Sequence, residues 1–237
     1  MFPITGTIQL FLSLILFYLT LLFYRTYRLE GGIIAKFFFF VFALFALIFL
    51  ALALPAIFMT KNQSVWLVAM VLVSFFQVLV GAILGYIITY LKSSKISPRT
   101  GFFSLLIIET ILVIPSVIHP PLHFLKPNGV VGMTVEPWVA ILRYLGILIF
   151  LIPGGIVFLQ QAIKTQESRI KIRSFGLGLG FLSITLVYLI DFILTTFFKV
   201  DPLWSDIILG ITFLIMLLIV LFAPTVMKRS RWARLIK

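Results

Sequence analysis

Long runs of apolar residues recur along almost the whole chain, and they limit the fold more than any other feature. Few charges interrupt these runs, which cover residues 6–24, 33–59, 65–91, 102–118, 139–163, 175–198 and 205–227. A helix rises about 1.5 Å per residue, so each run can span a hydrocarbon core of about 30 Å, the longer ones with tilt. The sequence therefore predicts an all-α fold, a polytopic membrane bundle of seven transmembrane helices over residues 1–227.

The composition excludes several classes of protein. Hydrophobic residues make up 62% of the chain and charged residues only 11%, whereas soluble domains contain about a quarter charged residues. The expected spans and their short links use nearly every residue, so no room remains for a catalytic or nucleic-acid-binding domain. Cysteine is absent, which excludes disulfides and Cys-ligated metal or iron–sulfur sites. We expect no cofactor and no nucleic-acid partner.

The basic residues gather in alternate links, and this pattern predicts the orientation. One set of links, together with a basic tail at 228–237, holds fifteen of the nineteen Lys and Arg residues. The opposite set holds only Lys61, Lys126, Arg143 and Lys199. Cytoplasmic loops carry the excess of Lys and Arg. We therefore expect a multi-pass protein of the cell membrane with its N-terminus outside and its C-terminal tail in the cytoplasm.

Residues at the expected outer ends suggest how that side is built. Trp66, Trp138 and Trp204 fall at outer helix ends, where an indole ring is expected to sit at the membrane interface. The longest outer link, residues 119–138, contains prolines and glycines that prevent a regular helix. This link either caps an outward-facing cavity or is a passive connection, and the sequence leaves both interpretations open.

Charged groups inside the apolar runs are the main candidates for a functional site. A charge at the bilayer centre costs at least about 2.5 to 3.5 kcal/mol on insertion scales, so such residues need a reason. Glu109 lies near the middle of the fourth run. At 1.5 Å per residue, Asp191 lies about 10 Å and Arg143 about 6 Å inside the outer ends of their helices. The fifth and sixth helices are expected to be antiparallel neighbours, which would allow Arg143 to pair with Asp191.

Further polar side chains can complete a cavity open to the outside. Tyr188 lies on the same helix face as Asp191, while Gln77 and Tyr144 come from the third and fifth runs. The candidate ligand-binding residues are therefore Glu109, Arg143, Asp191, Tyr188, Tyr144 and Gln77. Two interpretations stay open, because these groups can either satisfy one another inside the bundle or bind a ligand or ion.

The residues usually required for catalysis or metal binding are missing. His119 and His123 lie close together in the outer link, but Glu136 is the only further ligand nearby, and a metal site needs three or four. No paired-His motif lies on a helix, and the run at 205–227 has no lysine for a retinal Schiff base. We predict a non-enzymatic protein. A lipid-modifying reaction that uses Glu109 or Asp191 is the enzymatic alternative.

A set of short motifs in the second half of the chain resembles a known family. These motifs are Ser97-Pro98-Arg99, Ile114-Pro115, His119 to His123, Tyr144, and the basic link Arg169 to Arg173 followed by Gly176-Leu177-Gly178. Together they resemble the N-terminal seven-transmembrane sensor region of membrane histidine kinases and related signalling proteins. The resemblance implies that a ligand or a membrane state acts on the helices to bias a cytoplasmic output domain. Only ten residues follow Met227, so the output is expected to pass to a separate protein through residues 164–174 and the tail.

Three functions follow from these observations. We predict a receptor-like sensor module that reads a small ligand, proton or lipid in an outer-half cavity and signals to a separate cytoplasmic partner. One alternative is a small-solute or ion transporter, since Pro153, Gly154 and Gly155 can break the fifth helix as in discontinuous carrier helices. The other alternative is an accessory structural subunit, whose helices pack against other subunits of a larger membrane complex.

Overall fold

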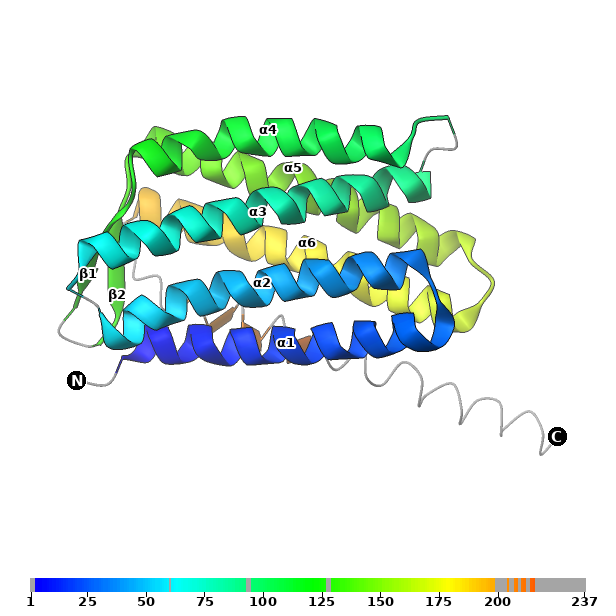
Figure 1. Ribbon diagram of the computed structural model, residues 1–237, viewed down its shortest axis with the longest axis horizontal. Coiled ribbons are helices and arrows are strands. Elements are labelled where there is room, and N and C mark those ends of the chain that lie inside the picture. Colours follow the sequence, from blue (N-terminus) through cyan, green and yellow to red (C-terminus); the bar gives the residue numbers. More distant parts are fainter. Residues whose placement is uncertain are drawn as a thin grey trace.

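The computed structural model describes residues 3–59, 61–92, 95–126 and 129–198, together with residues 204, 207, 208, 210, 211, 214 and 215. Within these residues the chain forms six long helices and one small hairpin (Figure 1). The helices are α1 (Ile4–Glu30), α2 (Ile33–Phe58), α3 (Gln63–Lys92), α4 (Pro98–Ile118), α5 (Pro137–Lys164) and α6 (Ser168–Thr196). The strands are β1 (Leu122–Leu125) and β2 (Val131–Thr134), which pair antiparallel with Leu122 opposite Thr134.

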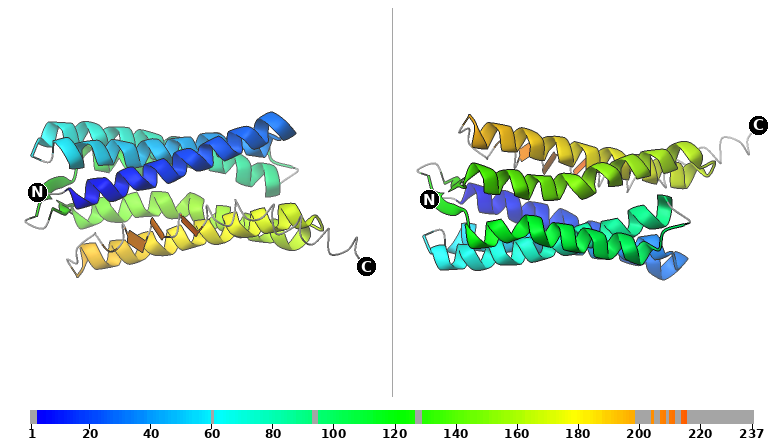
Figure 2. Two further views of the ribbon diagram at one scale, coloured as in Figure 1. Left: turned by 90° about the horizontal axis from the view of Figure 1, so that it is seen from below. Right: turned by 90° about the horizontal axis from the view of Figure 1, so that it is seen from above.

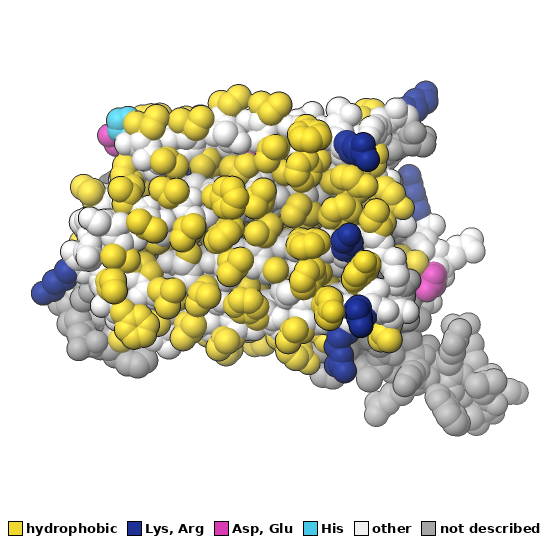
Figure 3. Space-filling view, in the orientation of Figure 1, with side chains coloured by type: hydrophobic (Ala, Val, Ile, Leu, Met, Phe, Trp, Pro, Cys, Tyr) yellow, Lys and Arg dark blue, Asp and Glu magenta, His cyan; other side chains and the backbone are white. Residues whose placement is uncertain are grey.

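The six described helices have the length and surface of membrane spans. Their apolar segments are 21 to 30 residues long, enough for each to cross a bilayer. Hydrophobic side chains cover the face of the bundle in Figure 3, and Lys and Arg side chains appear near the ends. An apolar surface of this extent is typical of contact with lipid. The chain thus has the architecture of a multi-pass membrane protein, and the predicted class of helical bundle is confirmed. The predicted seventh run, 205–227, lies mostly outside the described residues.

The observed helices match the first six predicted runs to within two residues or extend beyond them. α1 continues six residues past the predicted end, until Gly31 adopts a left-handed conformation with φ 68° and donates its N–H to the Tyr27 carbonyl at 2.8 Å. α6 begins at Ser168, seven residues before the predicted start. Polar residues outside the apolar runs continue these helices because helical hydrogen bonding does not require an apolar side chain. The basic link expected over 164–174 is therefore only residues 165–167.

Glycines allow neighbouring helices to approach closely. The helices pack as the pairs α1 with α2, α3 with α4, and α5 with α6, and Figure 2 shows the α5 and α6 pair lying beside α2, α3 and α4. A Cβ atom added at Gly85 on α3 would lie 2.5 Å from the Gly101 carbonyl oxygen on α4. At the α5 and α6 contact, a Cβ at Gly155 would lie 2.7 Å from Leu182 Cγ. The Gly81 and Gly85 spacing on α3 thus allows α4 to pack closely against this helix.

Helix α5 runs without interruption through Pro153, so it lacks the break that the transporter alternative invoked. Proline removes one backbone donor, but membrane helices tolerate this loss when neighbouring helices pack around the site. Phe158 on α5 and Phe181 on α6 pack next to Phe38 of α2, with ring centroids 5.3 to 6.3 Å apart. All three rings are at most 3% exposed. They form a closed aromatic core in the half of the bundle away from the hairpin.

The link between α4 and α5 departs from helix by forming the hairpin. Pro120 and Pro121 precede β1, and Gly129 adopts φ 82° in the turn between the strands. Side chains in β1 alternate, because Leu122 and Phe124 are exposed while His123 is buried. The all-α class is confirmed for the body of the protein, and these eight strand residues are the exception.

Candidate functional site

A cavity of about 170 Å³ lies inside the bundle beneath the hairpin. Its walls come from α1, α2, α3, α5 and α6, and its roof comes from β1 and β2. Most of the lining is apolar, including Phe45, Phe49 and Met70. An engineered apolar cavity of roughly 150 Å³ holds benzene, so this space suits a molecule of about one ring.

Five of the six predicted ligand-binding residues line this cavity. They are Gln77 on α3, Arg143 and Tyr144 on α5, and Tyr188 and Asp191 on α6. The Tyr144 hydroxyl donates a hydrogen bond to Asp191 Oδ2 at 2.9 Å, and the Tyr144 ring lies edge-on to Tyr188 with centroids 6.4 Å apart. Arg143 is close enough to act electrostatically on Tyr144. Direct pairing of Arg143 with Asp191 stays a prediction.

Glu109, the sixth predicted residue, does not line the cavity. Its side chain is fully buried where α4 packs against α3 and α5. A Cβ atom at Gly81 would lie 2.8 Å from Glu109 Cγ, and one at Gly146 would lie 2.9 Å from Glu109 Oε2. The two glycines therefore make room for the carboxyl group. Gln77 is the predicted site residue that lies next to Glu109.

Hydrogen bonds fix the hairpin to α1 and α3, so that it caps the cavity. The Val131 N–H donates to Thr5 Oγ1 at 3.0 Å, and Gln63 Nε2 donates to the His123 carbonyl at 2.5 Å. The Ile4 N–H donates to the Gly129 carbonyl at 3.2 Å. Of the two interpretations of this link, the structure therefore supports the cap.

His123 belongs to this roof and was not among the predicted ligand-binding residues. Its imidazole stacks on Trp66 with ring centroids 4.0 Å apart and an interplanar angle of 5°. Trp66 is only 2% exposed, so its ring is covered by the hairpin, whereas Trp138 and Trp204 are exposed at 45% and 63%. The sequence did not indicate which way the His123 ring would face, because that depends on the strand alternation in β1.

Burial sets the charge of His123. The pKa of His123 is lowered to about 4, mainly by burial and to a lesser extent by the positive charge of Arg143. The imidazole is therefore neutral at neutral pH. Its Nδ1 atom has no hydrogen-bond partner within the described part of the chain. The same holds for Gln77 Nε2 and for Oε1 of Gln9, a further cavity residue on α1. Buried polar atoms normally have partners, so His123 Nδ1 and Gln9 Oε1 mark the cavity as a place for a polar ligand group, while Gln77 Nε2 lies next to Glu109.

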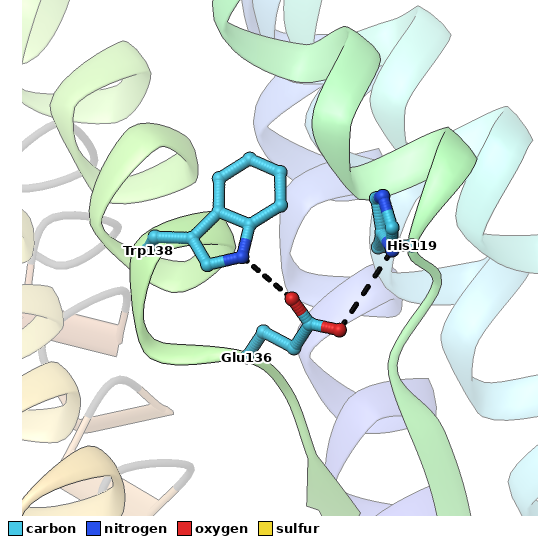
Figure 4. Close-up of polar contacts among 3 residues, drawn as sticks. All are labelled: His119, Glu136 and Trp138. Atoms are coloured by element: carbon cyan, nitrogen blue, oxygen red, sulfur yellow. Dashed lines mark hydrogen bonds and ion pairs between the residues drawn. The ribbon is translucent and has the colours of Figure 1, made fainter.

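A second polar cluster lies at the surface beside the hairpin (Figure 4). Trp138 Nε1 donates to Glu136 Oε2 at 2.5 Å, and His119 Nδ1 lies 3.7 Å from Glu136 Oε1. This contact joins the end of α4 to the start of α5. His119 and His123 therefore face different surroundings. No group of three His, Cys, Asp or Glu side chains among the described residues could hold a metal ion.

No protein-family model matches the chain, and a search of curated proteins found no match.

Proposed function

We propose that the chain is a receptor-like sensor of the cell membrane that binds a small molecule in the cavity under the hairpin. The observation that carries this proposal is the convergence of unpartnered buried polar atoms, Gln9 Oε1 and His123 Nδ1, on one ring-sized cavity. Arg143 and Asp191 bring one charge of each sign to the lining, so the ligand that fits best has no net charge. It combines an apolar body with a hydrogen-bonding head, as a neutral or zwitterionic ring compound does.

The charge pattern supports the proposed orientation. In the described helices, Arg25, Arg28, Lys92 and Lys164 lie near the end opposite the hairpin, where Figure 3 shows most of the visible Lys and Arg side chains. We place this end in the cytoplasm and the hairpin outside. A C-terminal tail on the cytoplasmic side requires a seventh span. In support, a Cβ at Gly210 would lie 3.5 Å from Leu12 Cδ2 on α1.

Two features favour a sensor over a transporter. The aromatic core of Phe38, Phe158 and Phe181 is densely packed between the cavity and the basic end, which leaves a binding site with access from one side. The second feature is the unbroken helix α5, because carriers with discontinuous helices expose backbone groups to their substrate. The resemblance to sensor regions of histidine kinases points the same way. The output would pass through the short link 165–167 and the tail to a separate cytoplasmic protein.

A cavity-filling substitution provides the test. Val73 on α3 lines the cavity and is 2% exposed, whereas Val68 on the same helix is 60% exposed. We would purify the wild type, Val73→Phe and the control Val68→Phe in mild detergent and identify bound small molecules and proteins by mass spectrometry. The proposal expects a small molecule that the wild type and Val68→Phe retain and Val73→Phe loses. Co-purified membrane subunits without such a molecule would favour the accessory subunit, and solute flux into proteoliposomes would favour the transporter.

A further inference from the structure

Glu109 is a titratable group that the proposed ligand site does not use. It lies near the middle of α4, about 14 Å from the hairpin end of that helix at 1.5 Å per residue. Its side chain is 0% exposed. The backbones of Gly81 and Gly146 and the ring of Phe150 surround the carboxyl group. The sequence therefore places an acid at a position to which neither lipid nor bulk water has access.

No nearby positive charge compensates the carboxyl group. On α3, Tyr86, Tyr90 and Lys92 lie at least about 7 Å further along the helix than Gly81, toward the basic end. On α5, Arg143 and Tyr144 turn into the cavity, and Lys164 lies at the basic end. Within the described residues, neither oxygen of Glu109 has a partner that meets the distance and angle of a hydrogen bond. An ionised carboxylate without a partner is strongly disfavoured in such surroundings, and a neutral carboxylic acid is far less so.

Gln77 lies between this carboxyl group and the cavity. Its amide group is close enough to Glu109 to interact with the carboxyl group, although the two do not reach full hydrogen-bond geometry. The same side chain lines the cavity and is 6% exposed. An amide offers an acceptor oxygen at one end and a donor nitrogen at the other. Gln77 can therefore accept a hydrogen bond from the protonated carboxyl group through Oε1 or donate one to the carboxylate through Nε2. In each case the other group of the amide faces the cavity.

We propose that Glu109 is a proton-binding site that exchanges its proton with the cavity through Gln77. In the loaded state, the Glu109 O–H donates to Gln77 Oε1, and the Gln77 amide N–H groups point to the cavity. To unload, the Gln77 amide rotates aside, and a water molecule from the cavity takes the Glu109 proton, which leaves a carboxylate and a hydronium ion in the cavity. Gln77 Nε2 then donates to the carboxylate, and Oε1 faces the cavity. This proposal rests on the packing around Glu109 and holds whether or not the cavity binds an organic ligand.

Infrared spectroscopy of the intact protein in lipid tests the proton site directly. A protonated carboxyl group in apolar surroundings has a carbonyl stretching band that shifts when its proton is replaced by deuterium. We expect this band in the wild type at neutral pH, its loss in Glu109→Gln, and its retention in Asp191→Asn. Absence of a band that differs between the wild type and Glu109→Gln would show that Glu109 is ionised, and it would overturn the proposal.

The rate of deuterium exchange tests the role of Gln77. Replacing Gln77 with Leu removes the only polar link to the cavity named above, and we expect the Glu109 band to shift at least tenfold more slowly in D2O. Ser74→Ala is the matched control, because Ser74 lies on the same helix and is buried to a similar extent at 5% exposed. Equal exchange rates in Gln77→Leu and the wild type would exclude Gln77 as the route. A similar slowing in Ser74→Ala would mean that the effect is one of general packing, which also contradicts the proposal.

Discussion

The hydroxyl of Tyr144 donates a hydrogen bond of 2.9 Å to Oδ2 of Asp191, and this contact joins α5 to α6 at the wall of the cavity. The two residues are 47 positions apart in the chain. Both were predicted as site residues from their place inside apolar runs, yet the sequence suggested Arg143 as the partner of Asp191. Tyr144 thus holds one oxygen of the Asp191 carboxylate at the cavity, and the pairing of Asp191 with Arg143 stays a prediction.

Removal of this hydroxyl is expected to weaken the helix pair. Tyr144→Phe should lower the free energy of unfolding by about 0.6 to 1.7 kcal/mol, the average and the maximum measured for side-chain hydrogen bonds between membrane helices. Thermal or detergent-induced unfolding of the reconstituted protein provides the measurement. Tyr18→Phe is the control, because Tyr18 on α1 is 46% exposed. An equal loss in both variants would mean that the contact does not contribute.

The stability of the hairpin roof should depend on pH through His123. The folded state holds this histidine with a pKa of about 4, below the value of about 6.5 in an unfolded chain. Between these two values the unfolded state binds more protons, so the folded state loses stability as the pH falls. A difference of this size corresponds to about 3 kcal/mol lost between neutral pH and pH 4. Unfolding curves at a series of pH values measure the effect.

Substitutions at the two histidines separate this effect from general acid sensitivity. His123→Phe keeps an aromatic ring against Trp66 but cannot take up a proton, so most of the pH dependence between 6.5 and 4 should disappear. His119→Phe changes a histidine that is 48% exposed at its side chain, and this variant should retain the dependence. The interpretation is wrong if the two variants respond to pH alike.

Helix α4 should be sensitive to any side chain added at its contact with α3. A Cβ at Gly85 would lie 2.5 Å from the Gly101 carbonyl oxygen, a backbone atom that cannot rotate away. Gly85→Ala should therefore destabilise the fold by about 1 to 3 kcal/mol, the usual cost of overpacking. Gly32→Ala is the control, since no atom lies within 4 Å of a Cβ at that position and its φ of −72° suits alanine. Unfolding in a denaturing detergent compares the two, and equal stability would contradict the contact.

The proposed orientation can be tested by labelling single cysteines, because the chain contains none of its own. Lys61→Cys lies in the exposed link between α2 and α3, and Gln166→Cys lies in the exposed link between α5 and α6. A membrane-impermeant maleimide should label Lys61→Cys in intact cells and Gln166→Cys only after permeabilisation. The opposite pattern would reverse the orientation.

The features that the sequence predicted well depend on the high cost of placing polar groups in lipid. Long apolar runs mark helices without ambiguity, and Gln77, Tyr144 and Asp191 stood out because polar residues inside such runs need partners. The helix ends were less accurate, since Arg28 and Lys171 continue helices beyond the apolar runs.

The remaining features depend on how segments face one another, which a single sequence does not specify. Glu109 lies apart from the cavity because Gly81 and Gly146 let α4 approach α3 and α5 at that level. His123 and Trp66 became cavity residues only through the hairpin, whose eight strand residues carry too short an alternation to predict. Gln9 could have been found by the reasoning that identified Gln77, since it too is a polar residue inside an apolar run.

The attachment of the roof has a consequence for the rates of binding. Three hydrogen bonds hold the hairpin to α1 and α3, through Ile4, Thr5 and Gln63. A molecule in the cavity would leave on the side of the hairpin only after these bonds open. Dissociation would then proceed at the pace of roof opening, so compounds with different contacts inside the cavity would share similar residence times. Their affinities would differ mainly through the association rate, the reverse of the usual behaviour at an open site.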